Sequence, residues 1–266
     1  YDPVLGRFIS KDSVEGDITN PLSLNLYTYC HNDPLNYWDP SGHWEAGDEN
    51  LPIWAQTAIL VYTGQYMNAT DQAGRNRAHA NAQAVRDLIN SGLYQSREDW
   101  GAKPSKNPLR PSHNYFDTIA LHHTERSQNE TINSLQKSFL NNKKVDYDDI
   151  GYHFVIGGDG TIYEGRGIEY EGGHVIGSNT GKIGIALMGN FETEDSVLNN
   201  AKNYLQGASP TQPTAAQIES AERITKILND AYNIKTIGGH RSFWDKTKCP
   251  GSAGSEVLKH LYKNLH

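Results

Sequence analysis

The stretch Gly238-Gly239-His240-Arg241-Ser242-Phe243-Trp244-Asp245-Lys246-Thr247-Lys248-Cys249-Pro250-Gly251 decides how the rest of the chain is interpreted. It places a histidine nine positions before one of only two cysteines. A short loop can bring such an imidazole and thiolate to one Zn²⁺. A catalytic site needs a third ligand, and the best candidate is the His122-His123 pair that ends the apolar residues 118–121. We therefore expect a His₂Cys zinc site with an open fourth position for water. The alternative is a buried free cysteine beside a histidine with ordinary hydrogen bonds.

Length and cysteine content limit the class of protein. The 266 residues suffice for one large domain or for a domain with an appendage. Cys30 and Cys249 give no disulfide framework, and no run is long and apolar enough to span a bilayer. The first residues, Tyr1-Asp2-Pro3-Val4, lack the basic start and apolar core of a signal peptide. We expect the chain to be a fragment of a longer protein.

The net charge of −7 is unevenly distributed. Residues 1–43 carry −4, residues 44–93 carry −2, and the remainder is nearly neutral at −1. The sequence has no run of basic residues, so a nucleic acid is a poor candidate partner.

Residues 1–43 are rich in turn formers and aromatic side chains, with Asp-Pro pairs at 2–3, 33–34 and 39–40. On their own they indicate short strands and turns without a core. Three motifs stand out: Tyr1-Asp2-Pro3 with Gly6-Arg7-Phe8-Ile9-Ser10, Leu24-Asn25-Leu26-Tyr27-Thr28-Tyr29, and Asn32-Asp33-Pro34-Leu35-Asn36-Tyr37-Trp38-Asp39-Pro40-Ser41-Gly42. Together they closely resemble the C-terminal end of an Rhs/YD-repeat core, which forms a β-cage around a C-terminal toxin.

That resemblance implies an aspartyl autoprotease, in which two carboxylates share a proton and activate water. The matching residues are Asp12 and Asp39, and cleavage would fall near His43–Trp44. The family usually has leucine where this chain has His43. We expect no cleavage in this chain alone, because most of the cage is missing. The alternative is that Asp39 caps a turn.

Residues 44–93 change in character. Residues 51–67 are apolar enough for a helix, and Thr70 or Asp71 could cap a second helix that ends near Asn90. We interpret the segment as a helical linker, with a role in translocation or targeting as the less favoured alternative.

Residues 94–266 predict an α/β domain with one mixed β-sheet covered by helices. Gly157-Gly158-Asp159-Gly160 is a hairpin signal, and Thr214-Ala215-Ala216-Gln217 is a capping box. Expected strands are 118–122, 152–156, 161–164 and 182–188; expected helices are 129–140, 214–233 and one marked by Val257, Leu258, Leu261 and Leu265.

From Ser96 onward the motifs form a specific series. They are Ser96-Arg97-Glu98-Asp99-Trp100-Gly101-Ala102, Leu121-His122-His123-Thr124, Gly151-Tyr152-His153-Phe154-Val155-Ile156, Asp159-Gly160, Gly165-Arg166, Gly173-His174, Gly184-Ile185-Ala186-Leu187-Met188-Gly189-Asn190-Phe191, Gly239-His240-Arg241 and Cys249-Pro250-Gly251. The series resembles peptidoglycan recognition proteins and zinc-dependent N-acetylmuramoyl-L-alanine amidases (amidase type 2). Each motif alone would be a weak signal.

The resemblance implies that His122, His240 and Cys249 hold Zn²⁺. His123 is then structural, because neighbouring strand residues point to opposite faces; the reverse choice stays open. The loop from His240 to Cys249 is one residue longer than the usual family spacing, and it could bulge around Trp244.

The resemblance also implies catalytic and substrate-binding residues. Tyr152 matches the catalytic tyrosine, Thr247 or the adjacent Lys248 matches the residue that contacts the oxyanion, and His174 matches a groove histidine that contacts substrate. The alternatives are a core tyrosine for Tyr152 and a turn residue for His174. His153 is expected to pack beneath the sheet.

These resemblances predict a zinc amidase that cuts the lactyl–L-alanine bond of peptidoglycan. The Rhs-like segment, residues 1–43, implies an antibacterial toxin delivered by a type VI or similar apparatus to the periplasm or cell wall of a target bacterium. Implied partners are the rest of the Rhs cage and a cognate immunity protein. The alternative is a non-catalytic peptidoglycan-binding module, and the presence of Cys249 with Tyr152 favours catalysis.

Overall fold

The computed structural model describes residues 47–113, 115–192 and 211–265. The predictions for residues 1–43, including Asp12 and Asp39, lie outside the described residues. By internal contacts the chain divides into two compact units, Tyr1–Val85 and Arg86–His266. The boundaries expected at 43/44 and 93/94 remain predictions.

The described part of the first unit is helical. A short 3₁₀ helix, η3 (Asp48–Asn50), precedes α1 (Ile53–Asn68), and α2 (Gln72–Asn90) crosses the boundary between the units. The carboxylate of Asp71 accepts the Gly74 N–H at 2.7 Å and so caps the start of α2. Both helices predicted for this segment are confirmed. Among the helices that the structure describes, none has the length and apolar character that a membrane crossing requires.

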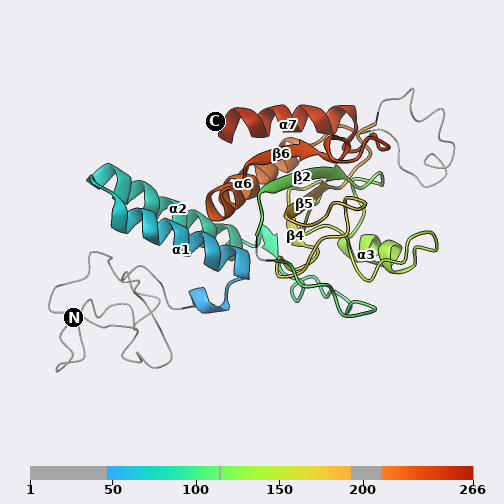
Figure 1. The fold of residues 1–266 in the computed structure, drawn as a ribbon, viewed down its shortest axis with the longest axis horizontal. Helices are drawn as coiled ribbons and strands as arrows, with labels where there is room; N and C mark the ends of the chain where they lie inside the picture. The colour runs from blue at the N-terminus through green and yellow to red at the C-terminus, as the bar shows by residue number, and fades with distance from the viewer. Residues whose placement is uncertain (1–46, 114, 193–210, 266) are drawn as a thin grey trace. The chain divides into compact units, whose positions relative to one another are not determined.

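A six-stranded sheet forms the centre of the second unit, in the order β1-β4-β3-β5-β2-β6 (Figure 1). β3 and β4 are antiparallel, and the other neighbours are parallel, so the sheet is mixed as predicted. All six residues of β2 are buried between β5 and β6. The first four, Thr118-Ile119-Ala120-Leu121, are apolar or β-branched, as expected of a buried parallel strand. The strands are β1 (Tyr94–Gln95), β2 (Thr118–His123), β3 (Phe154–Ile156), β4 (Ile162–Glu164), β5 (Lys182–Leu187) and β6 (Thr236–Gly239).

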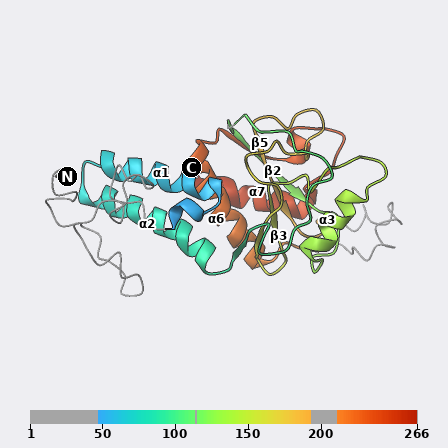
Figure 2. The same ribbon diagram turned by 90° about the horizontal axis from the view of Figure 1, so that it is seen from below.

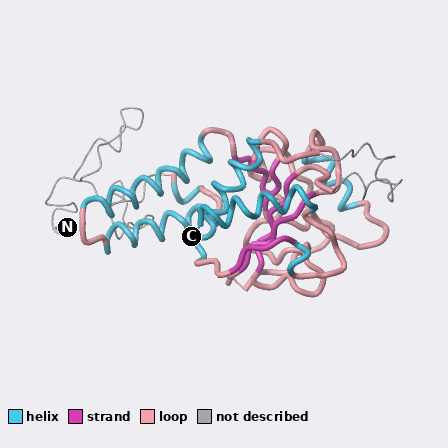
Figure 3. Tube along the Cα trace, turned by 90° about the horizontal axis from the view of Figure 1, so that it is seen from above, coloured by secondary structure: helices cyan, strands magenta, loops and turns pink. Residues whose placement is uncertain are grey.

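Helices cover both faces of this sheet. Figure 1 shows α6 (Ala215–Tyr232) and α7 (Gly251–Leu265) on one side and α3 (Ile132–Leu140) on the other. The same elements can be followed from below in Figure 2 and by element type in Figure 3. Under α3 a core cluster of buried side chains joins Trp100, Ile132, Leu135, Ile150, Val155 and Met188. The predicted fold class, a mixed sheet covered by helices, is confirmed.

Two helix boundaries differ from those predicted. α3 begins at Ile132, three residues late, because the Thr131 side chain caps it by accepting the Ser134 N–H at 3.2 Å. α7 begins at Gly251, well before the apolar residues that predicted it. The small residues between Gly251 and Ser255 show no apolar periodicity, so the sequence does not predict the first turn of this helix.

The start of α6 supplies the first testable prediction. Thr214 and Gln217 form the predicted capping box, and the Thr214 hydroxyl also donates to the Gly158 carbonyl at 2.8 Å. Thr214→Ala removes a cap and this link to the hairpin turn. It is expected to lower the free energy of unfolding by about 1–2 kcal/mol.

Chemical denaturation of the metal-free protein measures this effect. Thr214→Ser is the matched control, because it keeps the hydroxyl and is expected to retain most of the stability. Equal stability of wild type and Thr214→Ala would show that the cap contributes nothing.

Candidate metal centre

Two neighbouring strands bring the candidate histidines together. β2 and β6 are parallel, and Leu121 pairs with Gly239. His122 is the residue after Leu121 in β2, and His240 directly follows the end of β6, so their rings lie side by side with centroids 4.6 Å apart. The carboxyl end of the sheet therefore presents two imidazoles at one point. His240 also starts η4 (His240–Ser242), a 3₁₀ helix that turns the chain away from β6.

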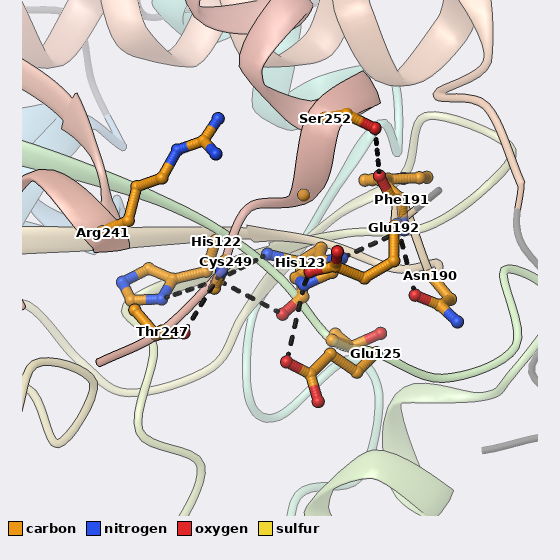
Figure 4. A network of polar contacts seen from close by, with 12 residues as sticks. His122, His123, Glu125, Asn190, Phe191, Glu192, Arg241, Thr247, Cys249 and Ser252 are labelled. Carbon is orange, nitrogen blue, oxygen red and sulfur yellow. Dashed lines mark hydrogen bonds and ion pairs between the residues drawn. The ribbon is translucent and has the colours of Figure 1, made fainter. Parts of the chain in front are cut away.

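The loop after η4 returns Cys249 to the same point. The Arg241 N–H donates to the Cys249 carbonyl at 2.9 Å, and the Cys249 N–H donates to the Thr247 hydroxyl at 3.1 Å. These bonds hold the cysteine Sγ 3.6 Å from His122 Nδ1 (Figure 4). Trp244 of this loop stacks on the His240 ring, with centroids 5.6 Å apart.

These residues fit a zinc ion. The ligand atoms of His122, His240 and Cys249 all lie within 4.8 Å of one another, and they form the one such group found among the described residues. Tetrahedral bonds of ~2.3 Å to sulfur and ~2.0–2.1 Å to nitrogen separate the two atoms by about 3.5 Å, close to the observed 3.6 Å. His240 Nε2 is buried and makes no hydrogen bond within the described residues. A metal ion would satisfy such a nitrogen.

Burial sets the protonation of the metal-free site. It lowers the pKa of His122 well below the usual value, with further lowering from His174 and His240 nearby. It likewise lowers the pKa of His240 and raises that of the Cys249 thiol. Both imidazoles are therefore neutral and can offer lone pairs to a metal. The thiol must lose its proton when a metal binds, because the thiolate is the ligand.

A cleft of about 340 Å³ opens over this cluster. Four predicted site residues lie in its wall: Tyr152, His240, Thr247 and Cys249. The Tyr152 ring lies 5.0 Å from the His122 ring, while Lys248, next to Thr247, is exposed. The residues that line the cleft are His123, Thr124, Glu125, Arg126, Leu135, Ser138, Phe139, Asn142, Tyr147, Tyr152, His240, Thr247 and Cys249.

His123, the residue next to the candidate ligand His122, makes a different set of contacts. Its Nδ1 accepts the Phe191 N–H at 3.0 Å, so its Nε2 carries the proton. That nitrogen lies 3.6 Å from a Glu125 carboxylate oxygen and 3.9 Å from one of Glu192 (Figure 4). The backbone N–H of His123 also points at Cys249 Sγ, at 3.4 Å. His123 therefore holds surrounding chain in place, as predicted, and its main chain contacts the candidate thiolate.

Glu125 was not singled out from the sequence. Its backbone is left-handed, with φ of 55°, a conformation that costs free energy in a non-glycine residue. The turn directs its carboxylate toward His123 beside the cleft. No sequence signal marks such a position, because glutamate has no preference for positive φ.

His174, predicted to contact substrate, lies against the candidate ligand His122. It is buried, and it is absent from the described residues that line the cleft. Its Nδ1 is 3.0 Å from His122 Nε2, so it contacts the candidate ligand instead of open solvent. A direct contact of His174 with substrate remains a prediction. His153 packs inside the domain as expected, where Gly184 N–H donates to its Nδ1 at 3.0 Å.

Comparison with known proteins identifies the family. The sequence profile of the N-acetylmuramoyl-L-alanine amidases (Amidase_2) matches residues 112–252. The chain belongs to this amidase family. The match contains all three candidate metal ligands, and it confirms the family resemblance found in the second unit. The resemblance of residues 1–43 to an Rhs core remains a prediction.

Several relatives of this amidase domain carry names that refer to peptidoglycan. The peptidoglycan-recognition protein SC1a of Drosophila melanogaster is 32% identical over 173 residues, which are 60% of this chain and 82% of that protein. An N-acetylmuramoyl-L-alanine amidase of Sus scrofa is 26% identical over 198 residues, covering 71% of this chain and 30% of that protein. The ectodomain complex of peptidoglycan recognition proteins LCa and LCx, solved with bound tracheal cytotoxin, matches with a TM-score of 0.51 at 27% identity, covering 62% of this chain and 94% of that one.

Proposed function

We propose that the chain is a zinc-dependent N-acetylmuramoyl-L-alanine amidase that hydrolyses the bond between the lactyl group of N-acetylmuramic acid and L-alanine in peptidoglycan. The observation that carries the proposal is the group of His122, His240 and Cys249, of which His240 and Cys249 line the cleft. A bound zinc ion would polarise the scissile carbonyl and activate water. Three protein ligands leave a tetrahedral ion one open position, which distinguishes a catalytic from a structural site.

Tyr152 is suited to stabilise the developing oxyanion. Burial, followed by the proximity of Cys249, Tyr147 and Glu125, raises its pKa well above the usual value. Its hydroxyl therefore stays protonated at neutral pH and can donate a hydrogen bond to the carbonyl oxygen as negative charge develops. Thr247 lies on the same cleft wall, and its hydroxyl, which accepts the Cys249 N–H, still has its own proton to donate. Lys248, adjacent and exposed, is the second candidate for that contact.

The proposal is tested by mass spectrometry of purified peptidoglycan after incubation with the full chain. Stem peptides that begin at L-alanine are expected, and a zinc chelator should abolish their release. Added Zn²⁺ should restore release after chelation. Release of any other fragment would assign a different bond.

A non-catalytic recognition module is the second candidate, since several relatives are named for recognition. It would bind wall fragments tightly and release no stem peptide. The same incubation, followed by sedimentation of the wall with bound protein, separates the two functions. Binding without release would overturn the amidase.

We also propose an antibacterial role, which rests on the Rhs-like residues 1–43. An exported effector must reach the periplasm or cell wall of the target, where peptidoglycan lies. Expression of the chain in a Gram-negative host with a periplasmic signal peptide is expected to lyse the cells, and expression without that signal is not. Cys249→Ala with the signal peptide is the control. Intact cells, despite export of a chain that cuts peptidoglycan in vitro, would overturn this role. The cognate immunity protein would be recognised as a gene that suppresses the lysis.

A further inference from the structure

A second buried imidazole, that of His174, lies behind the candidate ligand His122. His122 Nε2 and His174 Nδ1 are 3.0 Å apart, and the two rings are nearly perpendicular at 87°. At this distance one nitrogen donates its proton to the lone pair of the other. On its far side, His174 Nε2 lies 3.4 Å from the Lys182 carbonyl oxygen. The three groups form a chain of hydrogen bonds that leads to the ligand.

The Lys182 carbonyl sets the direction of these hydrogen bonds. A carbonyl oxygen only accepts, so His174 Nε2 carries the proton and His174 Nδ1 offers a lone pair. His122 must then donate from Nε2, which leaves the lone pair of His122 on Nδ1. That nitrogen is the one that lies 3.6 Å from Cys249 Sγ. The hydrogen bond to the Lys182 carbonyl and a metal ion bound at His122 Nδ1 therefore require the same tautomer of His122.

Two glycines, Gly172 and Gly184, leave space for the His174 ring. A Cβ added at Gly184 would lie 2.7 Å from the ring, and one at Gly172 would lie within contact distance of the same imidazole. Glycine at both positions leaves the space that the ring fills. The backbone N–H groups of His174 and Val175 both donate to Asn179 Oδ1, at 2.9 and 2.7 Å. Asn179 thus holds the backbone of His174, and the Lys182 carbonyl of β5 holds its ring.

We propose that His174 is a positioning residue of the metal centre, which holds His122 in the tautomer and orientation that direct its Nδ1 lone pair at the zinc ion. The inference rests on the zinc centre proposed above. Partners of this kind commonly change metal affinity by roughly 10–100-fold when they are removed. Sequence alone could not distinguish this role from a substrate contact, because the loop that carries His174 has no periodic signal.

The first test measures Zn²⁺ affinity of the full chain by competition with a fluorescent chelator. His174→Leu fills a similar volume and cannot accept a hydrogen bond, so Zn²⁺ should bind about 10–100-fold more weakly. His174→Asn is the matched variant, because its Oδ1 occupies the place of Nδ1 and can accept from His122. It should recover most of the lost affinity. Thermal melting of the metal-free variants shows whether each remains folded.

The second test locates the ring proton of His122. Nitrogen-15 NMR of the metal-free wild type should show the proton of His122 on Nε2, and His174→Leu should lose that preference. A proton on Nδ1 in the wild type would overturn the proposal, as would equal Zn²⁺ affinity of wild type and His174→Leu. If the folded His174→Leu and His174→Asn variants lost the same amount of Zn²⁺ affinity, His174 would be a packing residue only. A wild type that binds no Zn²⁺ would overturn the zinc centre itself, an outcome distinct from all of these.

Discussion

Cys249→Ala is expected to abolish both zinc binding and the release of stem peptides. The thiolate is the only anionic ligand in the proposed set, and two neutral imidazoles alone hold Zn²⁺ poorly. The cysteine is 4% exposed, with its Sγ 3.6 Å from His122 Nδ1. No other described side chain joins the group of metal-binding residues to replace it. Zinc content after dialysis, measured by mass spectrometry, and peptide release from purified wall are the two readouts.

The fold should survive this substitution. Alanine removes one buried sulfur atom, which costs about 1 kcal/mol in a packed site, and the backbone bonds of Cys249 to Arg241 and Thr247 stay in place. Circular dichroism of the metal-free proteins should therefore be nearly identical. Cys249→Asp tests the ligand itself, since a carboxylate also binds zinc and should retain part of the affinity.

Cys30 supplies the matched control, because it is the other cysteine of the chain. Cys30→Ala is expected to keep full zinc content and activity. If Cys249→Ala retained one zinc per chain together with hydrolysis, Cys249 would be removed from the ligand set. Loss of zinc with unchanged hydrolysis would instead separate the metal from the reaction.

The sequence predicted most of the framework of the second unit from local patterns. β2 and β5 are short, apolar and β-branched, and such runs read as buried strands. The capping box fixed the start of α6. By contrast, β1 is only two residues long, and its pairing with β4 depends on chain segments far apart in sequence. No local pattern reports such a contact.

The family resemblance indicated His122 as the ligand, and alternation along a strand then indicated a structural role for His123. The structure agrees, since His122 joins His240 and Cys249 while the His123 ring contacts the Phe191 backbone. The location of His174 could not be obtained in this way. A loop residue has no face set by a period, so its position depends on the ring-sized space left by Gly172 and Gly184. That space exists only in the folded chain.

Tyr152→Phe is expected to lower kcat by about 10²-fold or more while zinc binding stays unchanged. An effect of this size is typical when one oxyanion-stabilising or proton-donating group is lost. Phenylalanine keeps the ring that packs at 5.0 Å from His122 and 5.6 Å from Phe139. Only the hydroxyl is removed, so the cleft wall and the fold should persist. An interaction made only in the transition state lowers kcat and kcat/KM equally, with KM little changed.

Tyr147→Phe is the control for this substitution. Tyr147 lines the same cleft and contacts the same Phe139 ring at 4.8 Å, but it lies outside the ring contacts of His122. Steady-state hydrolysis of a soluble muramyl peptide, with zinc content measured in parallel, compares the two variants. Tyr147→Phe should leave kcat close to the wild-type value. A wild-type kcat for Tyr152→Phe would remove the hydroxyl from the reaction and leave Thr247 and Lys248 as the proposed oxyanion donors. A raised KM alone would instead make Tyr152 a substrate-binding residue.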